Sequence, residues 1–248
     1  MNPESRASAC MALSLSTVLS VGFAIGAEVE PPATATTTLK QAQSDRLARI
    51  PGLEIMFSGN GVPKFLAGET GVIVMTGSQA EMDRLLADLG PAFLARGTES
   101  LTVTRRRVVR DANVVSYRAS QMIRGMPVFV TATVIAARND TGEVIKVSGG
   151  FLPDHGLDVT PVVSADAAAR AATAVVRQVT GDEGDELTRA RIVEGPTLGY
   201  ALAGDAGVLA WEIKLSADTT SRDDRLEHLL IDAMSGDLID RFPDVIVN

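Results

Sequence analysis

Cysteine and histidine are scarce in this sequence of 248 residues, and each scarcity removes a class of chemistry. The one cysteine, Cys10, lies close to the N-terminus, so the rest of the chain has no disulfide and no cysteine nucleophile. The two histidines, His155 and His228, are too far apart for the H-E-x-x-H pattern that holds zinc on a helix. A G-x-S-x-G elbow and a glycine-rich phosphate loop are also missing. We therefore expect no catalytic residue, no metal site and no cofactor, and we expect that the chain is not an enzyme.

Aromatic residues and positive charge are also in short supply. Aromatics make up 4% of the chain, and 31 acidic residues against 23 basic ones give a net charge of -8, which repels phosphate backbones. The one basic cluster, Arg105, Arg106, Arg107 and Arg110, has no aromatic side chains between its arginines on which bases could stack. On a strand Arg105 and Arg107 share a face, which suits an acidic protein partner; an ordinary exposed sheet face is the alternative. We expect no nucleic-acid partner.

The N-terminal segment has the layout of an export signal. Arg6 precedes an apolar run over residues 9–24, and the small residues Gly26 and Ala27 follow it. This pattern predicts a signal peptide over residues 1–27, a secreted or periplasmic location, and no membrane association after cleavage. An uncleaved membrane anchor is the alternative. The sequence PPATATTT then predicts that residues 28–38 are a linker.

Hydrophobic spacing predicts the elements that follow the linker. Apolar residues on one helical face predict a helix over 39–50, and short apolar runs bounded by Gly, Pro or Asn predict strands at 53–57 and 71–75. Ser78, with Glu81 three residues later, forms a capping box that predicts the start of a second helix. That helix is expected to end at Gly97, with Pro91 as a point where it can break.

From Leu101 the hydrophobic period changes to two. Four strands are expected, over residues 101–109, 113–124, 126–137 and 143–149. Their short connections, which include Gly125 and an Asn-Asp-Thr-Gly turn, predict an antiparallel meander.

A second unit repeats the combination of a helix and strands. Ser164 precedes an alanine-rich segment that predicts a helix, and alternating apolar runs predict strands from residue 187 to residue 240. The acidic segment 182–186 lacks the ligand spacing of a calcium loop and predicts a solvated loop. The fold class is therefore α+β, with two units that each pack a helix on an antiparallel β-sheet.

The segment VVSYRASQMIRGMPVFVTATVIAARNDTGEVIKVSGGFLPD resembles the fungalysin/thermolysin propeptide (FTP) domain of thermolysin-like metalloprotease precursors. In that family a strand leads to an x-G-V-P-V-F hairpin, a D-x-x-G turn and a V-x-S-V-S-G strand. The residues in step with this pattern include Arg118, Gln121, Gly125, Pro127, Gly142 and Gly149.

The following unit is similar to the PepSY domain of the same precursors. An alanine-rich helix after P-x-x-S, a strand containing LAWEI, and the ending LLIDAMSGDLID, with Asp232 and Gly236, carry this similarity. The expected domains are then FTP-like over 39–152 and PepSY-like, with a C-terminal tail, over 153–248. No H-E-x-x-H segment follows, so we expect a propeptide without its protease.

The resemblance implies a secreted, non-catalytic protein that binds a thermolysin-like zinc metalloprotease as an inhibitor, with a chaperone-like role in its folding. It implies that the sheet faces dock on the protease and that the C-terminal segment approaches the active-site cleft. The expected protease-contacting residues are Phe242, Val245, Ile246 and Val247, and a last edge strand or a solvated end is the alternative for this tail. Two other functions remain open: an extracytoplasmic binding or scaffold protein, and a truncated protease precursor that has lost its catalytic domain.

Overall fold

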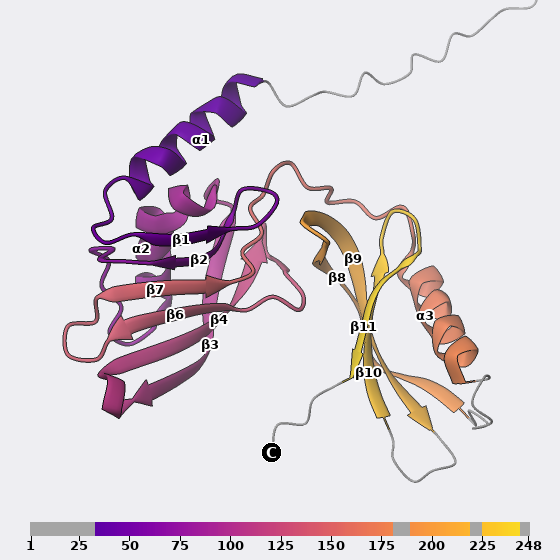
Figure 1. Ribbon diagram of the computed structural model, residues 1–248. Coiled ribbons are helices and arrows are strands. Elements are labelled where there is room, and N and C mark those ends of the chain that lie inside the picture. The colour runs from indigo at the N-terminus through magenta and orange to yellow at the C-terminus, as the bar shows by residue number, and fades with distance from the viewer. Residues whose placement is uncertain (1–32, 181–188, 219–224, 244–248) are drawn as a thin grey trace, which may run out of the picture. The chain divides into compact units, whose positions relative to one another are not determined.

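The computed structural model describes residues 33–180, 189–218 and 225–243 (Figure 1). These residues form helices and two antiparallel sheets, one of seven strands and one of four. The expected α+β class is confirmed. The predicted signal peptide and the acidic segment 182–186 lie outside the described residues.

The seven-stranded sheet is built mainly from a meander. Its path is β1-β2-β7-β6-β4-β3, and β5 pairs with β4 beside this path. The strands are β1 (Glu54–Phe57), β2 (Pro63–Ala67), β3 (Glu99–Val109), β4 (Val114–Ile123), β5 (Met126–Pro127), β6 (Thr133–Arg138) and β7 (Val144–Gly149). The predicted order of the four consecutive strands is therefore confirmed, and β3 and β1 are the two edges of the sheet.

The third predicted strand, over residues 126–137, is wrong as a single element. It is divided into β5 and β6, and Val130, between them, has a positive φ of 61°. The reason is tertiary, because the N–H of Phe129 donates to the carbonyl of Tyr200 in the other sheet. Local β-propensity contains no information about a partner so far along the chain.

Two expectations for the N-terminal part are also wrong. Helix α1 spans Ala33–Leu47, so it begins inside the segment expected to be a linker and ends before Ile50. Residues 71–75 form only an isolated bridge, between Ile73 and Glu143, while the strand next to β1 is β2. The sequence pattern does not predict β2, because Pro63 interrupts the apolar run, although a proline is tolerated at the first position of a strand.

The second helix begins where the capping box predicts. Helix α2 spans Gln79–Leu89, and the N–H of Ser78 donates to the Glu81 carboxylate over 3.1 Å. The predicted end at Gly97 is wrong, because the helix tightens at Gly90 into a 3₁₀ turn, η1 (Gly90–Phe93), that contains Pro91. The break expected at Pro91 is therefore the actual end of the regular helix.

One face of this sheet carries the core. Alternate side chains of β4 and β6, such as Tyr117 and Ile135, are buried together with Met82, Leu85 and Leu89 of α2. The apolar stripe that predicts α2 is thus the stripe that it buries. Across the sheet, Tyr117 lies opposite Ile135 and Arg118 lies opposite Val134, so Arg118 belongs to the other face.

The four-stranded sheet has the order β11-β10-β9-β8, with a helix on one face (Figure 1). Helix α3 (Ala165–Thr180) begins after Ser164, whose hydroxyl oxygen accepts the N–H of Ala167 over 3.3 Å. Its alanines let it pack closely on the strands, with Ala168 and Ala172 fully buried. The strands are β8 (Arg189–Ala203), β9 (Ala206–Asp218), β10 (Arg225–Asp232) and β11 (Leu238–Pro243).

The glycines of the propeptide-like pattern differ in how much room they have. At Gly149, φ is 119° and a Cβ atom would collide with the carbonyl oxygen of Ala132, whereas at Gly125, φ is 80° and nothing lies within 4 Å of such an atom. Both positions disfavour a side chain through φ, but only Gly149 adds a collision with backbone. We expect Gly149→Ala to lower the free energy of unfolding by at least about 2 kcal/mol more than Gly125→Ala. Urea denaturation of the two variants measures this difference, and equal losses would contradict the collision.

Candidate functional site

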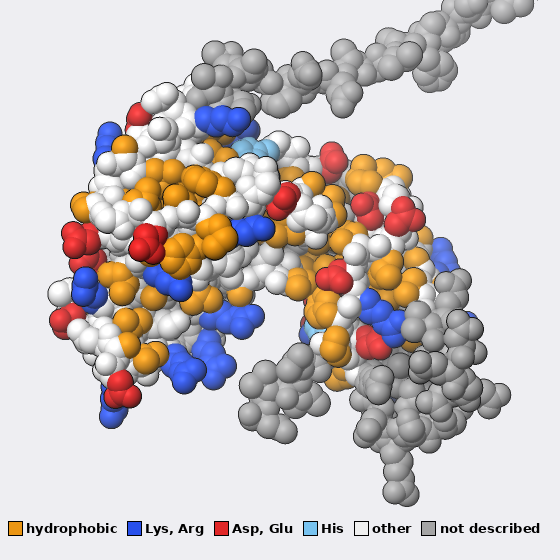
Figure 2. All heavy atoms as spheres, in the orientation of Figure 1, with side chains coloured by type: hydrophobic (Ala, Val, Ile, Leu, Met, Phe, Trp, Pro, Cys, Tyr) orange, Lys and Arg blue, Asp and Glu red, His pale blue; other side chains and the backbone are white. Residues whose placement is uncertain are grey.

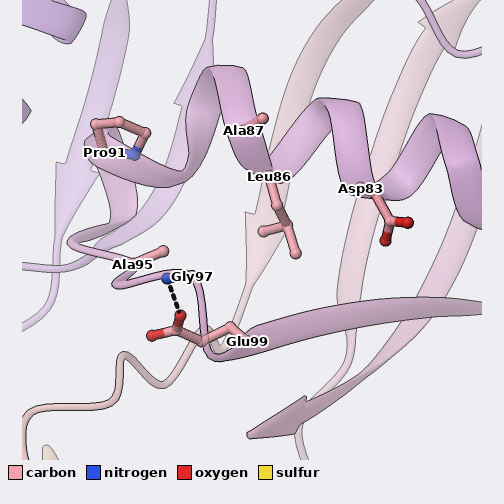
Figure 3. Close-up of a pocket in the computed structure, with 7 residues that line it drawn as sticks. All are labelled: Asp83, Leu86, Ala87, Pro91, Ala95, Gly97 and Glu99. Atoms are coloured by element: carbon pink, nitrogen blue, oxygen red, sulfur yellow. Dashed lines mark hydrogen bonds between the residues drawn. The ribbon is translucent and has the colours of Figure 1, made fainter. Parts of the chain in front are cut away.

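A surface pocket of about 410 Å³ lies between α2, η1 and the start of β3 (Figure 3). Its lining residues are Asp83, Leu86, Ala87, Pro91, Ala95, Gly97 and Glu99. The Glu99 carboxylate accepts N–H groups from Arg96, Gly97 and Thr98 through one oxygen and from Asp154 through the other. The carboxylate is therefore committed to main-chain donors, and the pocket lacks the convergent free polar groups that mark a small-molecule site.

The two histidines lie in unrelated environments. His155 is exposed in the segment after β7, while Nδ1 of His228 on β10 lies 2.9 Å from a carboxylate oxygen of Glu212. Within the described residues, no group of His, Cys, Asp and Glu side chains is placed to hold a metal ion.

The C-terminal strand is the part of the predicted protease-contacting segment that the structure describes. Phe242 is half-buried on β11, and its ring stacks on His228 with 4.9 Å between the ring centroids. The preceding residue, Arg241, forms a bidentate ion pair with Glu227, with nitrogen–oxygen distances of 2.6 and 2.7 Å. Up to Pro243 the tail is thus an edge strand tied to β10. Val245, Ile246 and Val247 lie outside the described residues.

Several motif residues of the seven-stranded sheet hold turns and connections in place. Gln121 is buried on β4, where its side-chain amide donates to the carbonyl of Leu152 and accepts the N–H of the same residue. This pair of bonds ties the segment after β7 to the sheet. Gly125 and Gly142 occupy turns with φ of 80° and 72°, and Pro127 lies in the short β5.

In the four-stranded sheet, Asp232 and Gly236 build the turn between β10 and β11. A carboxylate oxygen of Asp232 accepts the N–H groups of Met234 and Ser235 at 2.7 and 3.0 Å. The N–H of Gly236, at φ of 85°, donates to the carbonyl of Asp232. The D-A-x-S-G segment therefore sets the position of the strand that leads to the C-terminus.

Sequence reasoning missed a buried polar cluster formed by Glu99, Asp154, Arg124 and Thr98. The Asp154 side chain is 2% exposed, and its carboxylate binds the Arg124 guanidinium at 2.7 Å and the Thr98 hydroxyl at 2.9 Å. Burial by itself raises the pKa of Asp154, but the Thr98 hydrogen bond and the charge of Arg124 outweigh it and lower that pKa. Asp154 and Glu99 are 55 residues apart in sequence, so no local pattern predicts their contact.

The basic cluster is the most distinctive exposed feature. We call residues 104–118, the distal half of β3 with its turn and the paired half of β4, the basic hairpin. Arg105, Arg106, Arg107, Arg110 and Arg118 are all exposed there, and Figure 2 shows basic side chains gathered where β3 lies in Figure 1. The expectation that Arg105 and Arg107 share a face agrees with the register, in which they lie opposite Arg118 and Ser116.

Within the described residues, no helix is both long and apolar enough to cross a bilayer.

No protein-family model and no curated protein matches the sequence. Among solved structures, the chain is similar to the Bacillus megaterium YpeB C-terminal domain, with 13% sequence identity and a TM-score of 0.31. The similarity covers 84% of this chain and 96% of that chain. At this identity and TM-score the similarity assigns neither a family nor a function, so the function is inferred from the residues themselves.

Proposed function

We propose that the chain is an exported, non-catalytic binding protein, and that its partner is a thermolysin-like zinc metalloprotease, which it inhibits and helps to fold. The observation that carries the proposal is the fit between the propeptide-like pattern and its structural use. Gln121, Gly125 and Gly142 each fix a turn or a connection of the first sheet, and Gly149 lets β7 approach the backbone of Ala132 closely. Asp232 begins the turn that leads into the C-terminal strand. The signal-peptide pattern of residues 1–27 supports an exported protein.

The position of β11 supports a role for the tail. β11 is the edge of its sheet and is held to β10 by backbone pairing and by the Arg241–Glu227 pair. A segment that continues from an anchored edge strand loses less conformational entropy on binding than one that continues from a free loop. Val245, Ile246 and Val247 then supply the apolar side chains that a hydrophobic protease subsite takes. Phe242 plays a different part, since its stacking on His228 makes it an anchor for the segment.

The test is inhibition of a purified thermolysin-like protease by the chain from residue 28 onward. We expect a version that ends at Pro243, which keeps all of β11, to inhibit at least about tenfold more weakly, because three buried aliphatic side chains contribute more than the 1.4 kcal/mol that corresponds to this factor. Phe242→Ala should also weaken inhibition. Leu238→Ala, which shortens an exposed side chain on the same strand, is the matched control and should not.

Two results would count against the proposal in different ways. If the shortened chain inhibits as well as the full chain, the tail does not occupy the cleft. If neither version inhibits or binds the protease, the partner is wrong, and an extracytoplasmic scaffold or a remnant of a lost precursor becomes the better description.

A further inference from the structure

The distal half of β3 (residues 104–109) differs from its proximal half (residues 99–103) in exposure, in edge contacts and in charge. The burial of β3 ends near Val103, and every residue from Thr104 to Val109 is exposed. An irregularity in the pairing with β4, between Val103 and Arg105, separates the halves. Beyond this point the strand lies outside the cover that α2 gives to the proximal half.

The outer edge of the two halves also differs. In the proximal half, the Gln79 side chain of α2 donates to the carbonyl of Leu101 over 3.0 Å and accepts the Thr102 hydroxyl over 3.3 Å. From Arg105 to Val109, within the described part of the chain, β4 is the only strand that pairs with β3. A row of main-chain donors and acceptors along an unpaired edge is a template for another strand.

The arginines of this edge form no salt bridge with an acidic side chain in the part of the chain that the structure describes. This holds for Arg105, Arg107 and Arg118, although the whole chain carries a net charge of -8. Arg105 and Arg118 are direct partners across the strands. Like charges in this position destabilise a sheet, so an anionic group placed beside them relieves a repulsion as well as forming new bonds.

We propose that the distal edge of β3 binds an extended acidic segment of a second protein, which adds to the sheet as a further strand. The pleat places Arg105, Arg107 and the half-exposed Val109 on one face and Arg106 and Val108 on the other. The segment that fits has consecutive acidic residues beside the arginines and apolar residues beside the two valines. The inference uses residues of β3 and β4 and none of the C-terminal tail, so it goes beyond the proposed function and does not depend on it.

The probe is a fluorescent peptide with three consecutive glutamates flanked on each side by two valines, which fits the edge in either direction. We expect it to bind the full chain, and we expect Arg105→Glu or Arg107→Glu to weaken binding about tenfold or more, the loss that follows from removing a charge-assisted hydrogen bond. Arg170→Glu, an exposed arginine on α3, is the matched control and should leave binding unchanged. Because Arg105→Glu replaces a like-charge pair by an opposite-charge pair, it should not lower the melting temperature, which separates lost binding from lost folding.

A second peptide tests strand addition itself. Methylation of alternate backbone nitrogens keeps every charge but removes main-chain donors, so binding should fall about tenfold or more. Heparin, a polyanion without a peptide backbone, should compete poorly with the unmethylated peptide. If the methylated peptide or heparin binds as well as the original peptide, the hairpin is a general anion surface and the proposal is overturned. Failure of the original peptide to bind, or equal binding to Arg105→Glu, overturns it too, and protease inhibition is unaffected by any of these results.

Discussion

Replacing Glu81 by glutamine is expected to lower the free energy of unfolding near pH 7 by about 3 kcal/mol and to flatten its dependence on pH in acid. The Glu81 side chain is nearly buried at the start of α2 and accepts the N–H groups of Met75, Thr76, Gly77 and Ser78 and the hydroxyl of Thr76. Burial alone raises the pKa of Glu81, but these hydrogen bonds lower it from 4.5 to about 2. The glutamine side chain turns a donor toward this ring of donors, which leaves N–H groups without acceptors.

The direction of the pH effect follows from that lowered pKa. The folded protein stabilises the ionised form of Glu81 relative to the unfolded chain. This contribution to the free energy of unfolding is therefore present above about pH 4.5 and is lost as the pH falls toward 2. Urea denaturation between pH 7 and pH 2 measures it for the wild type and the variant. The control is Glu69→Gln, which changes an exposed carboxylate and should leave the wild-type curve intact. Parallel curves for wild type and Glu81→Gln would show that Glu81 is not the group that titrates.

Asp154→Ala is expected to lower the free energy of unfolding by about 3 kcal/mol, because it removes a buried acceptor from the polar cluster of Glu99, Asp154, Arg124 and Thr98. Its loss leaves the Thr98 hydroxyl and the N–H of Gly156 without their acceptor, and it removes the ion-pair partner of Arg124. Since Arg124 is 39% exposed, its charge can regain water, which keeps the cost at the low end for a broken buried pair.

The matched control for this prediction is Asp158→Ala, an exposed carboxylate four residues along the same segment. It should change the free energy of unfolding by less than about 0.5 kcal/mol. A double-mutant cycle with Arg124→Met then separates the ion pair from the hydrogen bonds to Thr98 and Gly156. A loss of less than about 1 kcal/mol in Asp154→Ala would mean that the segment after β7 is held by apolar contacts, not by the cluster.

The sequence predicts the parts of the fold that depend on neighbours close in the chain. The capping box of Ser78 and Glu81 marks the start of α2, and period-two runs separated by short turns mark the meander of β3, β4, β6 and β7. In each case the side chains that define the pattern also make the contacts that stabilise the element. Local information is then sufficient.

The errors occur where a distant segment decides the local structure. Residues 71–75 are as apolar as a strand, but they form an isolated bridge to the turn between β6 and β7 and not a ladder. The N–H of Val74 donates to the carbonyl of Gly142, and the N–H of Val144 donates to the carbonyl of Val72. The runs over residues 187–194 and 197–203 predict two strands, yet β8 spans Arg189–Ala203 and continues past Pro196 by bulging against β9. The contact between Glu99 and Asp154 is a further example, because no local sequence pattern predicts that these two distant residues meet.

The pairing of β2 with β7 also sets an order of events during synthesis. Phe65 lies opposite Ser148, so the hairpin of β1 and β2 joins the sheet only after β7, and with it all of the meander, has been made. Closing so long a loop is slow compared with forming the local hairpins of the meander. We therefore expect the meander and α2 to form a folding nucleus to which the N-terminal hairpin is added last, and mutations in β1 to accelerate unfolding more than they slow folding.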